Sequence, residues 1–120
     1  MSYRIAVGTS DGENVTEHFG QCAKWTIMEA GDDGVWRFLE SRAAPPSSGG
    51  AHDDEALRKF VEILGDCRAV LVSKIGPGAE RMLSRASITA FERSGAIDGA
   101  LRKLAEYYAR TERATASGRG

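Results

Sequence analysis

Residues 69–86, AVLVSKIGPGAERMLSRA, decide the fold. The segment AVLVS is short and apolar throughout, which is typical of a strand buried on both faces of a sheet. After it, Pro77 suits the first position of a helix, and apolar residues then recur at helical spacing: Ala79, Met82, Leu83 and Ala86. A buried strand followed at once by a helix predicts an α/β protein with right-handed crossovers between parallel strands.

The same alternation extends to both sides of this stretch. Upstream, HDDEALRKFVEILG predicts a helix, because its apolar residues share one face and three acids occupy its first turn. Downstream, SITAFE predicts a strand. The segment from residue 97 predicts the most regular helix, with one apolar stripe: Ile97, Ala100, Leu101, Leu104, Ala105 and Tyr108.

The first 51 residues have a different pattern, with a period of two. YRIAVG, at residues 3–8, alternates like a strand. KWTIMEA and VWRFLES are two further strands around GDDG, which suits the turn of an antiparallel hairpin. RAAPPSSGGA predicts a mobile loop. Residues 13–22, ENVTEHFGQC, show no strand or helix and are also expected to be a loop.

Together these elements predict a single α/β domain. The simplest sheet has five strands in the order 3-2-1-4-5, with strands 1, 4 and 5 parallel, the hairpin antiparallel, and helices on both faces. We expect the domain to span residues 1–109. Residues 110–120, rich in small and polar side chains, predict a flexible tail.

Composition limits the classes of function. The formal net charge is −1, and neither half of the chain is basic enough to indicate a nucleic-acid partner. No apolar run is long enough to span a membrane and the N-terminus does not resemble a signal peptide, so a cytoplasmic location is expected. The two cysteines, Cys22 and Cys67, are therefore expected to be thiols.

Topology predicts where a ligand would bind. In open α/β sheets, ligands bind outside the carboxyl ends of the strands, where the connections diverge. Residues 9–22, 48–52 and 73–78 should meet there. They contain both histidines of the chain, His18 and His52. Neutral imidazole binds iron, zinc or copper, although a histidine on a loop or at a helix start also serves as a plain polar residue.

The cysteines and the glycine-rich turn add weaker signals. Cys22 lies four residues after His18 without the spacing of a zinc site, and Cys67 reads as a core residue. Such an incomplete donor set suits a ligand that brings its own metal and sulfide. In SKIGPGAE, Gly76 and Gly78 permit close approach to amides at a helix start and Lys74 adds charge, so an anion could bind. The alternative is an ordinary strand-to-helix turn.

Catalytic arrangements are not favoured. The carboxylates near this edge could in principle form a two-metal nuclease site: Asp11, Glu13, Glu17, Asp53, Asp54 and Glu55. None of them lies in the middle of the first strand or at the end of the fourth, where such a site needs rigid support. No nucleophile elbow is present either. We expect a protein that is not an enzyme.

Three segments carry a resemblance to a known family. IAVGTSDGENVTEHFGQCAKWTIMEA, GGAHDDEALRKFVEILGDCRAVLVSKIGPGAERMLSRASITAFE and GAIDGALRKL together resemble the dinitrogenase iron–molybdenum cofactor biosynthesis family over about residues 3–106. The specific motifs are HFG after the first strand, GG-x-H-D, and the strand and turn around IGPGAE. Many relatives have a cysteine near GG-x-H, where this chain has Ser47 and Ser48.

The resemblance implies a ribonuclease-H-like three-layer fold and a role in nitrogen fixation. It implies that the chain carries an iron–molybdenum cofactor or an iron–sulfur precursor to nitrogenase assembly proteins. His18 would hold the cluster as a metal ligand, and the resemblance puts His52 and Cys22 near it. Two rival readings remain: a small anion- or nucleotide-binding regulatory module built on the Gly76–Gly78 turn, or an interaction domain without a ligand. The oligomeric state is not indicated.

Overall fold

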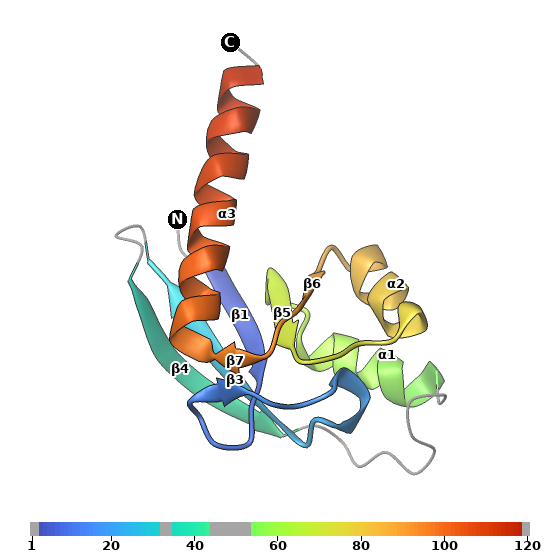
Figure 1. Ribbon diagram of the computed structural model, residues 1–120. Coiled ribbons are helices and arrows are strands. Elements are labelled where there is room, and N and C mark those ends of the chain that lie inside the picture. Colours follow the sequence, from blue (N-terminus) through green and yellow to red (C-terminus); the bar gives the residue numbers. More distant parts are fainter. Residues whose placement is uncertain (1–2, 32–34, 44–53, 119–120) are drawn as a thin grey trace.

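A five-stranded mixed sheet forms the centre of the molecule, seen in the computed structural model in Figure 1, which describes residues 3–31, 35–43 and 54–118. The predicted mixed sheet is confirmed. Its strands, in the order in which they lie side by side, are β4 (Trp36–Ala43), β3 (Lys24–Ala30), β1 (Tyr3–Gly8), β5 (Ala69–Val72) and β6 (Thr89–Glu92).

The directions of the strands follow from their connections. β1, β5 and β6 are parallel to one another, whereas β3 is antiparallel to β1 and to β4. The β3–β4 pair is the predicted hairpin, and its register shifts once, between Ile27 and Met28. All four residues of β5 are buried, as its unbroken apolar sequence predicts.

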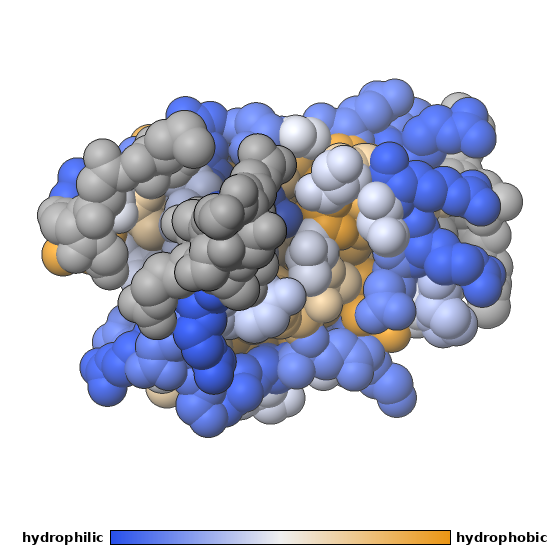
Figure 2. All heavy atoms as spheres, turned by 90° about the horizontal axis from the view of Figure 1, so that it is seen from above, coloured by the Kyte–Doolittle hydropathy of each residue, from blue (hydrophilic) through white to orange (hydrophobic). Residues whose placement is uncertain are grey.

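Helices cover both faces of the sheet, and three α-helices are present in the described residues: α1 (Asp54–Ile63), α2 (Pro77–Arg85) and α3 (Ile97–Gly118). On one face, Phe60 of α1 and Leu83 of α2 join a core that contains Trp25 of β3. On the other face, Leu101 of α3 packs in a core with Ile5 of β1. Figure 2 shows hydrophobic side chains gathered between hydrophilic rims at one end of these layers.

The last helix extends well beyond the body of the molecule (Figure 1). Its 22 residues measure about 33 Å. The backbone stays helical through Gly118, which differs from the flexible tail expected from residue 110. Arginine, glutamate and alanine in this segment are good helix formers, and they continue a helix that is already nucleated. The domain boundary at residue 109 stays a prediction.

The segment after β1 contains regular structure that the sequence analysis missed. Residues 13–22 were expected to be a plain loop, but they include the strand β2 (Asn14–Val15) and the 3₁₀ helix η1 (Phe19–Gln21). β2 pairs with β7 (Gly95–Ala96), which directly precedes α3. This second, two-stranded sheet ties the loop to the start of the last helix. The loop expected at residues 42–51 lies mostly outside the described residues.

Candidate functional site

The ends of β1 and β5 bring two predicted site segments together. The Gly8 carbonyl accepts hydrogen bonds from the backbone N–H groups of Thr16 and Glu17, at 3.1 and 3.2 Å. The Ser73 N–H donates to the Glu17 carbonyl at 3.0 Å. Val72 and Glu17 lie close to Gly8: a Cβ atom at Gly8 would lie 3.2 Å from Val72 Cγ1 and 3.3 Å from Glu17 Cβ. Residues 16–17 are therefore held against the sheet at the ends of β1 and β5, where the connections diverge.

His18 and Lys74 lie side by side on this edge. They form an isolated parallel bridge, and the next N–H, that of Phe19, donates to the Lys74 carbonyl at 2.9 Å. Both residues are exposed. His18 has an extended backbone and occupies the position before η1 without capping the helix through its side chain. Its imidazole and the Lys74 ammonium are thus presented to solvent from neighbouring backbone positions.

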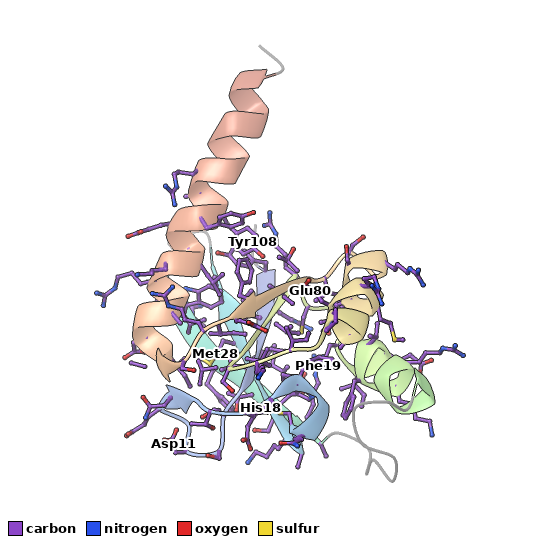
Figure 3. All side chains as sticks on the ribbon, turned by 45° about the vertical axis from the view of Figure 1, so that its right-hand side comes forward. Asp11, His18, Phe19, Met28, Glu80 and Tyr108 are labelled. Carbon is purple, nitrogen blue, oxygen red and sulfur yellow. The ribbon has the colours of Figure 1, made fainter. Side chains whose placement is uncertain are left out.

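Phe19 explains why His18 is so placed. Its ring is 1% exposed and packs at 5.4 Å from the ring of Trp25 and 5.7 Å from that of Phe60, measured between centroids. Figure 3 shows His18 and Phe19 at the end of the molecule opposite the projecting α3. The buried phenylalanine anchors the segment, while the preceding histidine stays outside the core.

The side chain of Cys22 lies in the core and not at the exposed edge. It is buried in the same core as Phe19, and its thiol donates to the Lys24 carbonyl at 3.2 Å. Burial raises the pKa of this thiol to about 11, so at neutral pH it carries a proton, whereas a metal ligand must be a thiolate. Nearness in sequence to His18 does not make Cys22 part of the exposed site. Cys67 is likewise buried, as predicted.

The turn from β5 to α2 leaves open space around its glycines. A Cβ atom at Gly76 or at Gly78 would meet no atom within 4 Å. Gly76 precedes α2 without a side-chain cap, and Pro77 occupies the first turn, as the sequence predicts. Since amides at a helix start are unpaired within the helix, those after Pro77 face a position that a ligand can approach.

The sequence did not predict one residue that forms a hydrogen bond with this turn. A carboxylate oxygen of Glu92, at the end of β6, accepts a hydrogen bond from the Ile75 N–H at 2.9 Å. Glu92 follows the turn by 17 residues, and no local motif marks it. Only the parallel pairing of β5 with β6 brings it to the site. In addition, the buried Ser73 hydroxyl has no hydrogen-bond partner in the part of the chain that the structure describes.

The remaining predicted residue is His52, which lies outside the described residues, as does the segment 48–52. Its approach to His18 therefore stays a prediction. Among the described residues, no group of three or more His, Cys, Asp or Glu side chains is arranged to hold a metal ion. No helix in the described ranges is long and apolar enough to cross a membrane.

These features define a class: a mixed α/β domain with an exposed histidine and an open helix start at the switch point of its sheet. The family model described as dinitrogenase iron-molybdenum cofactor matches residues 1–107, and the chain belongs to this family.

Two of the similar proteins carry the name FeMo cofactor biosynthesis protein NifB. A FeMo cofactor biosynthesis protein NifB of Frankia alni is 39% identical over 104 residues, which cover 83% of this chain and 20% of that protein. The corresponding NifB of Herbaspirillum seropedicae is 31% identical over 93 residues, 78% of this chain and 18% of the relative. The chain thus spans about a fifth of the length of these relatives.

The fold is also found among solved structures. The crystal structure of PH0822 matches with a TM-score of 0.64 at 20% sequence identity, covering 86% of this chain and 90% of that one. At this identity the likeness concerns the fold alone.

Proposed function

We propose that this chain binds and carries an iron–molybdenum cofactor, or an iron–sulfur precursor of it, during assembly of a nitrogenase-type metallocofactor. The family, together with the NifB relatives, supports this role. In this proposal the domain is a ribonuclease-H-like binding module, not a catalyst. It works in the cytoplasm and passes its cargo to cofactor assembly proteins.

The observation that carries the proposal is the bridge between His18 and Lys74. It sets a potential iron or molybdenum ligand beside a positively charged residue, and both are exposed. An anionic cluster contacting the imidazole would have the ammonium and the amides after Pro77 nearby to offset its charge.

Each site residue then has a distinct role. His18 ligates the cluster, and Lys74 attracts it. Gly76 and Gly78 allow it to approach the backbone because no side chain fills the space there. His52 is proposed as a second ligand from its loop. Cys22 stays near the site as a core residue that helps to position the His18 segment, and we leave its thiol out of the ligand set because it is buried and bonded to Lys24.

A carrier must also release its cargo. Few protein ligands and an exposed position suit transfer better than a closed cage of thiolates does. The open glycine turn and the exposed His18 support a transient complex of this kind.

The test is cluster uptake under anaerobic conditions. Purified protein is mixed with isolated iron–molybdenum cofactor or a [4Fe–4S] precursor, and the retained iron and molybdenum are measured after gel filtration. We expect His18→Ala to bind at least about tenfold more weakly, because losing even an outer-shell partner of a metal ligand costs about 10–100-fold in affinity. Gln21→Ala is a matched control, because Gln21 is exposed on η1 next to His18. Equal retention by wild type and His18→Ala rejects the proposed role of His18.

A second candidate function rests on the open helix start at Gly76. A small anion- or nucleotide-binding module would use the same turn without His18. Thermal stabilisation by phosphate or nucleotides that is lost in Lys74→Ala but kept in His18→Ala would favour this function over cluster carriage.

A further inference from the structure

A cleft opens beside the segment that follows β1. It has a volume of about 840 Å³ and is lined by residues of the loop 9–14, by β3 and β4, and by the start of α3. We call it the β4 cleft. Neither His18 nor Lys74 lines it. Figure 3 shows Asp11, from its lining, at the same end of the molecule as His18. The two sites therefore share an edge of the protein but are distinct.

One wall of the β4 cleft is held rigid. A carboxylate oxygen of Asp11 accepts the backbone N–H groups of Glu13 and Asn14, both at 2.8 Å. The Ile97 N–H donates to the Glu13 carbonyl at 2.9 Å, which fixes the loop against the start of α3. Gly12, at the tip, has a φ of +78°, where a side chain would be strained. A wall fixed in this way need not be ordered when a ligand binds.

Two apolar side chains form part of the floor of the cleft. Phe38 of β4 is 61% exposed, and Met28 of the paired position in β3 lies beside it. A large exposed aromatic side chain in a concave surface is a feature of binding sites, because such sites combine apolar contact area with a few polar groups.

The charges of the lining select a ligand of opposite sign. Asp11, Glu13 and Asp98 contribute three carboxylates, whereas Lys24 contributes a single ammonium. In the described residues no three such groups are arranged for a metal ion. The complementary ligand is therefore an organic cation with an apolar part, the chemistry of neighbouring basic and apolar side chains in a peptide.

β4 supplies a means of holding such a peptide. It is an eight-residue strand at the edge of the sheet, and within the described residues no other strand pairs with its outer side. An extended segment can add to an exposed edge through main-chain hydrogen bonds, and alternate side chains then lie over one face. Phe38 and Ser41 of β4 line the same cleft as the acidic residues Glu13 and Asp98.

We propose that the β4 cleft and the edge of β4 form a docking site for an extended segment of a partner protein that carries alternating basic and apolar residues. The segment adds to the sheet along β4, sets an apolar side chain on Phe38, and directs basic side chains to Glu13 and Asp98. Because the cleft and the His18 edge both follow β1, a partner docked here stands next to the His18 site. The docking itself does not depend on cluster binding.

The probe is an eight-residue capped peptide of alternating arginine and valine, labelled with a fluorophore and measured by fluorescence anisotropy without any cluster. We expect saturable binding to wild type, and binding at least about tenfold weaker to Phe38→Ser. Leu39→Ser is the matched control, because Leu39 is an exposed apolar neighbour on the same strand that does not line the cleft. Both variants change exposed side chains, and circular dichroism checks that they fold.

Four further outcomes test the proposal. The double variant Glu13→Gln with Asp98→Asn should weaken binding of this peptide and remove most of its salt dependence. A peptide methylated on the backbone nitrogens that face β4 should bind more weakly if strand addition holds. Equal binding by wild type, Phe38→Ser and Leu39→Ser overturns the proposal. So does sedimentation showing that wild type dimerises through Phe38, because the occupant is then a second copy of this chain.

Discussion

Replacing Phe19 by alanine should reveal how far the core supports the candidate site. Phe19 is 1% exposed and lies between the rings of Trp25 and Phe60. Its backbone N–H also donates to the Lys74 carbonyl. Phe19→Ala keeps that hydrogen bond but removes the side chain that fixes η1 to the core. The change therefore acts on the packing beneath His18 without touching the imidazole.

The expected loss of stability follows from the burial of this ring. Truncating a fully buried phenylalanine to alanine removes its transfer free energy and leaves a cavity, at a cost of about 3–5 kcal/mol. A domain of this size is stable by about 5–15 kcal/mol. With a urea dependence of about 2 kcal/mol per molar, the midpoint of unfolding should fall by about 1.5–2.5 M. Phe19→Leu should lie between wild type and Phe19→Ala.

Urea unfolding followed by tryptophan fluorescence measures this loss, since Trp25 packs against the ring. Phe38→Ala is the matched control: the chemical change is the same, but the ring is 61% exposed, so its effect should stay within about 0.5 kcal/mol. A loss below about 1 kcal/mol in Phe19→Ala, or equal losses in the two variants, would refute the anchoring of the His18 segment by Phe19.

Three other perturbations test separate parts of the structure. Asp66 accepts hydrogen bonds from Arg42 and Arg4, which hold the pKa of its carboxyl well below its usual range. Asp66→Asn should therefore lower the free energy of unfolding by about 1 kcal/mol at pH 7 and by less at pH 3, because this stabilisation is lost as the pH falls below about 4. Urea midpoints measured at several pH values test this difference. Burial raises the pKa of the thiols of Cys22 and Cys67 to about 11 and about 12, so both should react slowly with a thiol reagent at pH 8 and rapidly after unfolding. Gly78→Ala should leave the unfolding midpoint almost unchanged, because its Cβ meets nothing, yet should reduce cluster retention if the cargo approaches this turn.

Much of the central sheet could be predicted because buried elements have a recognisable pattern of apolar residues in the sequence. β5 is apolar at every position because both of its faces are covered, and it is fully buried. The hairpin of β3 and β4 follows from two strand-like runs around glycine and aspartate. α3 begins where its apolar stripe begins, at Ile97. In each case the signal extends over several residues and reflects one repeating environment.

The features that were missed depend on contacts between distant residues. β2 and β7 are two residues each, too short to show a period, and they pair across about 80 positions. Glu92 reaches the Ile75 amide only through the pairing of β5 with β6. The family resemblance placed Cys22 near the cluster, but its thiol is buried in the core and donates to the Lys24 carbonyl. The distance between two residues along the sequence did not predict which residues come into contact or where their side chains point.

The candidate site depends on a division of roles between adjacent residues. Phe19 is buried and fixes the backbone, while His18 is exposed and makes no side-chain cap to η1. Removing the exposed imidazole should therefore leave folding intact, whereas removing the buried ring should disturb both folding and uptake. Retained iron measured beside the urea midpoint separates the two effects. If His18→Ala unfolds as easily as Phe19→Ala, the histidine is a structural residue, and its exposure no longer argues for a role in cargo binding.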